Sequence, residues 1–263
     1  MMKSFLLPER FEEMLGINIR NAPERLAEAR ELGTRLAEAG VPLMQSPDHF
    51  AMFTDPPQLL AGPLKRLGYI VGADCRCYPS PVDGCDYINV AASLSSPSSL
   101  HEQGWPDHIA VVHPVDEAAS RRMLEQNYGN PFIHHITFGI EVPENTDTGA
   151  LVMRMVEVRK RITAILEKPP GTLIMALPGE IVRAPGFPQR FQGWLGNLET
   201  DQYQLEEMEG GGSLLQFFVL QGGRIEVALR YGTRQTFNPK SVHKISENEL
   251  SVDQGPVAAS GAM

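Results

Sequence analysis

The sequence predicts an α+β fold built from two related modules, each made of one strand, one helix and three further strands. Short apolar segments alternate with amphipathic helical segments, and Pro-, Gly- and Ser-rich connections separate them. A histidine also stands at the entrance of three predicted strands, which indicates a recurring structural theme. We therefore expect four parts: an N-terminal helical segment over 1–44, module one over 45–130, module two over 131–240 and a flexible tail over 241–263.

The N-terminal segment should contain a helix from Pro23 to Ala39. Asn21 can serve as its cap, Pro23 suits the first turn, and Gly40 ends it. The buried side of this helix is predicted to carry three leucines, Leu26, Leu32 and Leu36.

Module one is predicted to open with a strand over Asp48–Phe53. A helix should follow from Pro56 to Leu67 and end at Gly68. Its last strand is expected over Asp107–Val112, and the pattern indicates two further strands only weakly, at Tyr69–Val71 and Tyr87–Ala91.

Module two is predicted to open with a strand over His134–Phe138. A helix over Leu151–Leu166 should follow, with one apolar face made of Leu151, Met155, Val158, Ile162 and Ile165. Three strands then complete the module, over Thr172–Leu177, Leu214–Leu220 and Arg224–Tyr231. The segment Gly210–Ser213 is interpreted as a flexible hairpin or gate, and Gly222–Gly223 as a tight turn.

Charge and composition exclude several classes of function. The chain carries 23 Lys and Arg against 32 Asp and Glu, a formal net charge of -9, which disfavours nucleic acid as a partner. No apolar run is long enough for a membrane span, and no signal-peptide pattern opens the sequence, so we expect a cytoplasmic protein. Cys75, Cys77 and Cys85 are odd in number and clustered, which argues against a secreted disulfide framework and leaves their role open.

Strand alternation brings metal-ligating side chains to defined faces. Glu226 shares a strand face with Arg224 and Arg230, and His135 shares one with Thr137. If both strands line a common cleft, His135 and Glu226 can converge, and two imidazoles with one carboxylate suit Fe(II), Mn(II) or another first-row divalent ion. The rival interpretation is that Glu226 forms an ion pair with one of the two arginines.

Four other histidines receive different interpretations. Alternation places His134 on the face opposite His135, although a shift of one residue in register would exchange them. His113 lies on the opposite face of its strand from His108, while His101 and His243 are expected in polar loops.

The histidine-led strands, above all His134-His135-Ile136-Thr137, make residues 45–240 resemble the vicinal oxygen chelate superfamily of glyoxalase- and extradiol-dioxygenase-like proteins. The resemblance implies paired modules that form a cupped mixed sheet around a metal ion, with ligands on the first and last strands. It implies His49, His135 and Glu226 as the ligands. Their long separations are similar to those of the types related to hydroxyphenylpyruvate dioxygenase and 2-oxoadipate dioxygenase/decarboxylase.

That resemblance implies an Fe(II)-dependent non-haem oxygenase acting on a small organic acid or oxo acid, with Mn, Zn or Ni as other metals. The expected partner is a small-molecule carboxylate, bound by Arg230 or Arg224, and a homodimer is one expected assembly. One departure bears on the substrate: the acid-oxidising group keeps an arginine four residues after its first histidine, where this chain has Phe53.

Two other classes of function remain open at the level of sequence. In an isomerase or lyase of glyoxalase or epimerase type, His108 would act catalytically as a fourth ligand, and the metal would be a Lewis acid without redox change. In a non-catalytic small-molecule binding protein, no metal would be needed.

Overall fold

The structure, a computed structural model, describes most of the chain up to Tyr231. The described residues are 5–55, 58–80, 85–94, 99–114, 116–143, 146–196, 203–208, 212–220, 224–231 and 243–244, with the backbone alone described for 58, 72–80, 85–94, 99, 113, 220, 224 and 243–244. Several predictions therefore fall outside the described residues: the tail over 241–263 apart from His243 and Lys244, the Gly222–Gly223 turn, most of the Gly210–Ser213 segment, and the side chains of the three cysteines and of His113.

Contacts between residues divide the chain into two units. Unit 1 contains Met1–Leu6, Glu28–Asp48 and Thr137–Gln235, and unit 2 contains Leu7–Ala27, His49–Ile136 and Thr236–Met263. One strand, β5 (Phe132–Gly139), runs without a break from unit 2 into unit 1. Residues on either side of that boundary are therefore neighbours along a single strand.

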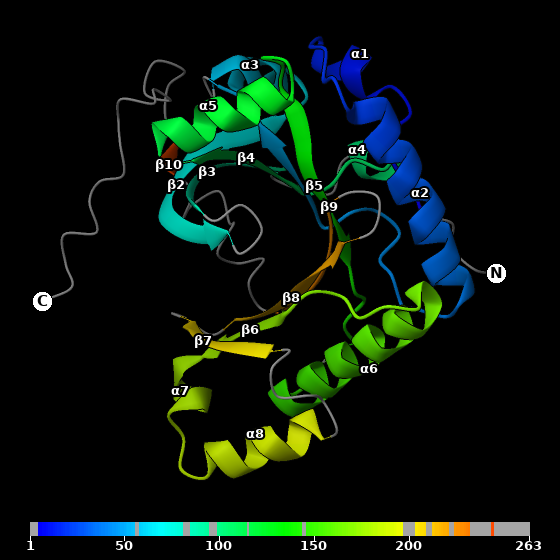
Figure 1. The fold of residues 1–263 in the computed structure, drawn as a ribbon, viewed down its shortest axis with the longest axis vertical. Helices are drawn as coiled ribbons and strands as arrows, with labels where there is room; N and C mark the ends of the chain where they lie inside the picture. The colour runs from blue at the N-terminus through cyan, green and yellow to red at the C-terminus, as the bar shows by residue number, and fades with distance from the viewer. Residues whose placement is uncertain are drawn as a thin grey trace, which may run out of the picture. The chain divides into compact units, whose positions relative to one another are not determined.

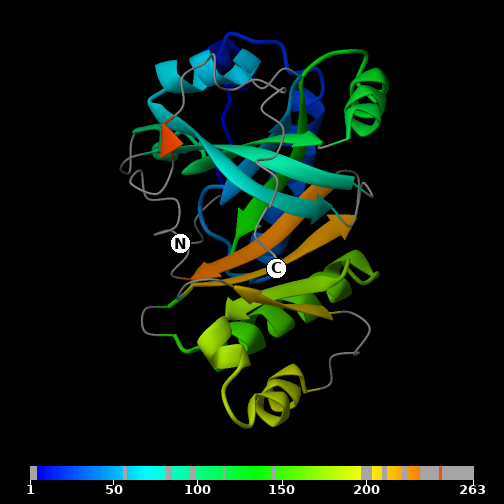
Figure 2. The same ribbon diagram turned by 90° about the vertical axis from the view of Figure 1, so that its left-hand side faces the viewer.

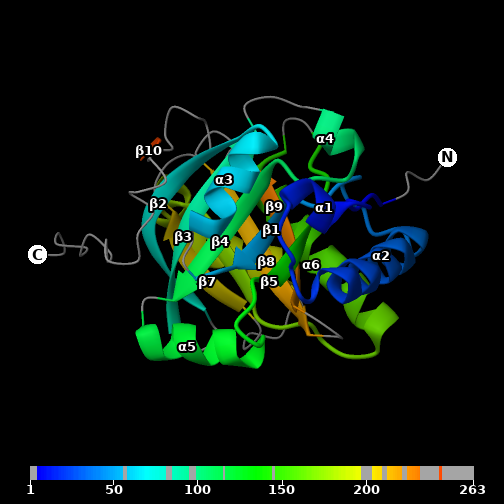
Figure 3. The ribbon, with the colours of Figure 1, turned by 90° about the horizontal axis from the view of Figure 1, so that it is seen from above.

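Unit 2 contains helices and a set of strands that pair with one another. Its elements are α1 (Phe11–Leu15), the start of α2 (Ala22–Glu38), β1 (His49–Phe53), α3 (Gln58–Arg66), β2 (Tyr69–Ser80), β3 (Cys85–Leu94), α4 (Ser99–Glu102), β4 (His108–Pro114), α5 (Glu117–Gln126), the first part of β5, and β10 (His243–Lys244). Strands β2, β3 and β4 run antiparallel side by side (Figure 2). β1 pairs with β4 in parallel, and the order β2-β3-β4-β1 can be followed in Figure 3.

The strand–helix–strand connection explains why β1 and β4 can be parallel. Parallel strands need a long crossover, and the segment from α3 through β3 supplies it. The pairing places His49 opposite His108 and Phe53 opposite Val112. The two histidine-led segments that the sequence singled out are thus in register.

One face of unit 2 packs against α5. Its apolar cluster consists of Ala51, Phe53, Ala110, Val112, Met123 and Phe132, with Leu124 packed against it. The rings of Phe53 and Phe132 stack with centroids 5.0 Å apart. Helix α5 begins where the Asp116 side chain accepts hydrogen bonds from the backbone N–H groups of Ala118 and Ala119.

Asn21 fastens the start of α2 to β5. Its side-chain amide donates to the Ile133 carbonyl at 2.9 Å, and the Ile133 N–H donates to Asn21 Oδ1 at 2.7 Å. The side chain thus bonds to a neighbouring strand, whereas the sequence suggested a helix cap. The three leucines predicted for the buried side of α2, Leu26, Leu32 and Leu36, are all buried.

Unit 1 contains the rest of the sheet and the longest helix. Its elements are the end of β5, α6 (Thr148–Leu166), β6 (Leu173–Pro178), α7 (Gly179–Val182), α8 (Phe187–Leu195), β7 (Tyr203–Met208), β8 (Ser213–Leu220) and β9 (Arg224–Tyr231). The strands follow the order β5-β9-β8-β6-β7, with β6 and β7 parallel. Helices α6 and α8 lie beside each other (Figure 1). Four of the five predicted apolar residues of α6 are buried, and Leu166 is buried where Ile165 was expected.

The α+β class predicted from the sequence is confirmed. The order strand, helix, three strands occurs as β1-α3-β2-β3-β4 and again as β5-α6-β6-β8-β9. The second series carries an insertion, α7-α8-β7, that was not predicted from the sequence. Helix α5 was not predicted either. The boundaries proposed for the two modules stay a prediction. Among the described helices, none combines the length and the apolar character that crossing a bilayer would require.

Tyr69 offers a test of packing in unit 2 that depends on pH. Its hydroxyl donates to the Pro106 carbonyl at 2.7 Å, and burial, with a smaller effect of the Asp107 carboxylate, raises the tyrosine's pKa far above its usual range. Folding therefore favours the neutral phenol. Its contribution is complete below the unfolded pKa of about 10 and declines as pH rises from there toward the folded pKa.

We expect Tyr69→Phe to cost about 1–3 kcal/mol of unfolding free energy near pH 7, because the Pro106 carbonyl loses its donor. The difference between wild type and variant should shrink above pH 10, as the buried tyrosine increasingly favours unfolding. Urea unfolding at several pH values measures this. A difference that stays constant or grows with pH would contradict the assignment.

Candidate metal centre

Two of the predicted ligands, His49 and His135, lie against each other in unit 2. His49 is the first residue of β1 and is buried, and His135 is partly buried in β5. Their Nε2 atoms are 3.2 Å apart, and the rings meet edge to face. The same ring atom, Nε2, of the two imidazoles is therefore brought close together.

The spacing of these nitrogens fits a shared metal ion. A metal–imidazole bond is about 2.0–2.1 Å, so two nitrogens on one ion at an octahedral or tetrahedral angle lie roughly 2.9–3.4 Å apart. The observed 3.2 Å falls inside that interval. Without a metal, the same distance suits one N–H···N hydrogen bond.

The predicted carboxylate, Glu226, is buried in β9 of unit 1. Its Oε2 accepts a hydrogen bond from the Thr137 hydroxyl at 2.6 Å. A buried carboxylate needs such partners, because an unpaired charge away from water is costly. Thr137 lies on β5, two residues after His135.

His49, His135 and Glu226 form a group that could hold a metal ion. The group offers two imidazole nitrogens and one carboxylate oxygen, and two of the three residues are buried. This donor set suits non-haem Fe(II) and related first-row divalent ions. These are the three side chains proposed as ligands from the sequence, and their role as ligands stays a prediction.

His108 lies next to His49 but is not a member of that group. The two residues are partners in the β1–β4 pairing, and their ring centroids are 5.9 Å apart. Among the described residues, the His-His-Glu group is the one that gathers three potential ligands. His108 therefore lies beside His49 on a different strand, β4.

Arg230, predicted to bind a substrate carboxylate, pairs with Asp48 in unit 1. Its Nε donates to Asp48 Oδ2 at 2.7 Å, and the side chains are 15% and 9% exposed. The rival interpretation of Glu226 was an ion pair with Arg230 or Arg224. The structure gives Arg230 a different carboxylate, and the side chain of Arg224 lies outside the described residues.

His134 contacts His135 directly, which strict alternation did not predict. The two Nδ1 atoms are 2.8 Å apart, although neighbouring residues of a regular strand project to opposite faces. The two rings are therefore within hydrogen-bond distance of each other. His101, expected in a loop, lies on α4 and pairs with Asp107 at 3.3 Å.

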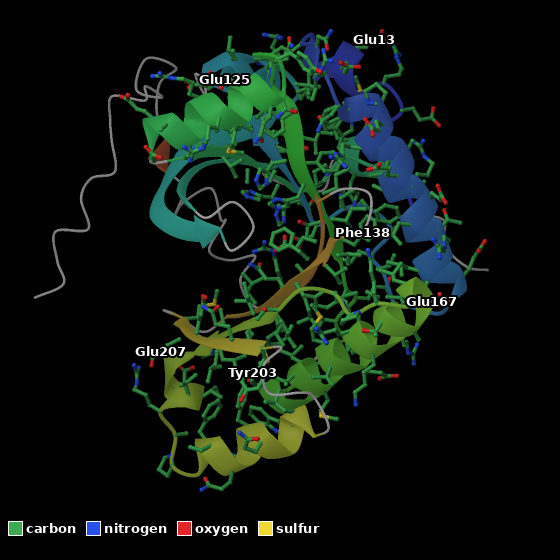
Figure 4. All side chains as sticks on the ribbon, in the orientation of Figure 1. Glu13, Glu125, Phe138, Glu167, Tyr203 and Glu207 are labelled. Carbon is green, nitrogen blue, oxygen red and sulfur yellow. The ribbon has the colours of Figure 1, made fainter. Side chains whose placement is uncertain are left out.

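Aromatic packing supports the end of β5 beyond His135. Phe138, labelled in Figure 4, is fully buried and meets Phe5 edge to face with centroids 4.7 Å apart. The backbone N–H of Asp48 also donates to the Thr137 carbonyl at 2.8 Å. Both contacts fix the strand segment that carries Thr137.

No protein-family model matches the chain, and no curated protein matches its sequence. Solved structures do match. A triple mutant of 4-hydroxymandelate synthase from Streptomyces coelicolor has a TM-score of 0.42 and 12% identity, and the match covers 78% of this chain and 51% of that one. This chain thus spans about half the length of that protein.

Two further solved structures match at similar levels. Methylmalonyl-CoA epimerase has a TM-score of 0.33 and 14% identity, with 71% of this chain and 96% of that chain covered. A xylose isomerase-like TIM barrel/4-hydroxyphenylpyruvate dioxygenase fusion protein has a TM-score of 0.35 and 13% identity. That match covers 74% of this chain and 29% of the fusion protein. All three are proteins of the vicinal oxygen chelate superfamily. At these identities and TM-scores, their activities do not carry over to this chain.

Proposed function

We propose that this chain is a metal-dependent enzyme, an Fe(II)-dependent non-haem oxygenase that acts on a small organic acid or oxo acid. The observation that carries the proposal is the 3.2 Å approach of His49 Nε2 and His135 Nε2, a spacing suited to neighbouring ligands of one ion. Glu226 is proposed as the third ligand, since it belongs to the same potential metal-binding group.

The proposed ligand set leaves room for substrate chemistry. His49, His135 and Glu226 would hold the ion through three protein atoms, fewer than a first-row divalent ion usually binds, so a small oxo acid could also reach it. When bound, a ferrous ion would supply the electron-transfer chemistry that side chains lack. The residues of the chain would fix the geometry and exclude water.

Thr137 and Asp48 have supporting roles in this proposal. The Thr137 hydroxyl donates to Oε2 of Glu226 and so orients the carboxylate. Asp48 holds the Arg230 guanidinium through Nε. Arg230, oriented in this way, is proposed to bind the carboxylate of the substrate, because guanidinium forms directional hydrogen bonds with planar oxyanions.

A second candidate function is an isomerase or lyase that uses a metal ion without redox change. It is favoured by His108, whose ring lies 5.9 Å from that of His49 and which could join the metal as a fourth ligand or move a proton. This candidate predicts activity with Zn or Ni in the absence of O2.

The test is to purify the chain without added metal, determine its metal content, and then reconstitute it anaerobically with Fe(II), Mn(II), Zn(II) or Ni(II). We expect about one iron per chain and O2 uptake with a member of a panel of small 2-oxo acids, in the Fe(II) form only. Turnover by the Zn or Ni form without O2 would favour the second candidate. Failure to hold any of the four metals would contradict both candidates and favour the binding protein.

A further inference from the structure

His134 is buried, and its two imidazole nitrogens have no role in the proposed function. Its side chain is 4% exposed, and its Nδ1 lies 2.8 Å from Nδ1 of His135. The opposite nitrogen of His135, Nε2, lies 3.2 Å from His49 Nε2. His135 is thus the middle ring in a chain of three imidazoles within unit 2.

The proton positions in this chain depend on one another. A neutral imidazole carries one N–H and one lone pair, and each close nitrogen pair needs one of each. Two arrangements of neutral rings satisfy both contacts. In the first, His135 Nδ1–H donates to His134 Nδ1, and Nε2 of His135 keeps its lone pair. In the second, His134 Nδ1–H donates to His135 Nδ1, and Nε2 of His135 carries the proton.

Only the first arrangement is compatible with a metal ion on Nε2 of His135. A metal ligand must present a lone pair, so the proton of a neutral His135 has to be on Nδ1. That N–H then needs an acceptor. His134 Nδ1 is in place at hydrogen-bond distance, and its low exposure limits replacement by bulk water.

We infer that His134 is a positioning residue whose Nδ1 accepts the Nδ1–H of His135 and keeps the Nε2 lone pair of His135 directed at the metal. This inference rests on the proposed metal-binding function. Acceptors of this kind orient a ligand ring and raise its basicity.

The first test reads the tautomers in the wild-type protein. Zn(II) is diamagnetic, so the ring nitrogens of a ¹⁵N-histidine-labelled, Zn-loaded sample can be followed by NMR. We expect His134 with bare Nδ1 and protonated Nε2, beside a His135 that is protonated on Nδ1. A protonated Nδ1 on His134 would overturn the inference.

The second test compares two substitutions by their affinity for Zn(II). His134→Asn places an acceptor oxygen near the former Nδ1, whereas His134→Leu removes the acceptor and retains bulk. We expect the leucine variant to bind Zn(II) about 10- to 100-fold more weakly than wild type, and the asparagine variant to recover most of that loss. Wild-type affinity in the leucine variant, or equal weakening in both, would overturn the inference.

The two proposals fail in distinguishable ways. If oxo acids give no O2 uptake but the two variants differ in Zn(II) affinity, the oxygenase function fails and the role of His134 stands. If neither variant folds, the wild-type tautomers still decide. If wild type binds none of the metals tested, both proposals fail.

Discussion

Replacing His135 by alanine should leave the purified protein without stoichiometric metal. The substitution removes one of three proposed ligands and breaks the 3.2 Å pair of Nε2 atoms. The loss of affinity should exceed the roughly 10- to 100-fold typical for a residue that only supports a ligand. Elemental analysis after purification, followed by titration with Fe(II) under anaerobic conditions, measures it.

Glu226→Ala should have the same effect, and two matched substitutions serve as controls. His101 is a partly exposed histidine paired with Asp107, and Glu207 is an exposed glutamate on β7, labelled in Figure 4, that pairs with Arg183. Their alanine variants should keep wild-type metal content. Metal retained in both His135→Ala and Glu226→Ala would show that the ligands are elsewhere.

The second large effect is expected at Arg230, where alanine should cost about 3–5 kcal/mol of unfolding free energy. Arg230 and Asp48 are 15% and 9% exposed, so little solvent screens the pair. Removing the guanidinium leaves the Asp48 carboxylate largely buried without that charged partner. Guanidinium chloride unfolding of wild type and variant at pH 7 gives the difference directly.

A double-mutant cycle separates the ion pair from packing. Arg230→Met removes the guanidinium and retains most of the volume, so adding Asp48→Asn to Arg230→Met should restore stability relative to Arg230→Met alone. If the double variant were no more stable than Arg230→Met, the loss would not come from the unpaired Asp48 charge. Lower affinity for an oxo acid in a double variant of near wild-type stability would support Arg230 as the substrate's carboxylate partner.

Much of the architecture was accessible from local patterns. The strands that carry His49, His108 and His135 were predicted within a few residues, because apolar runs bounded by turn residues are strong local signals. The elements that were not predicted have weaker local signals in the sequence. In α8, the buried residues Phe187, Phe191 and Leu195 have helical spacing, but Pro and Gly obscured it, and β7 is an edge strand with alternating exposed polar residues.

The candidate site was predictable in composition but not in its contacts. Alternation placed Thr137 near His135, yet its bond to Glu226 joins residues far apart in sequence and depends on tertiary pairing. Alternation did not predict the contact between His134 and His135, because it does not determine the ring orientations that bring their Nδ1 atoms together. The ligand roles, the cytoplasmic location and the homodimer stay predictions.

The parallel pairing of β1 with β4 has a consequence for how this protein matures. Hairpins such as β2–β3 and β8–β9 join neighbouring segments and close quickly, whereas β1 must wait until β4 has been made and folded. We therefore expect the segments that carry His49 and His108 to pair late, after most local structure has formed. A metal ion would therefore bind only after most of the chain has folded, so metal uptake should follow folding and not guide it.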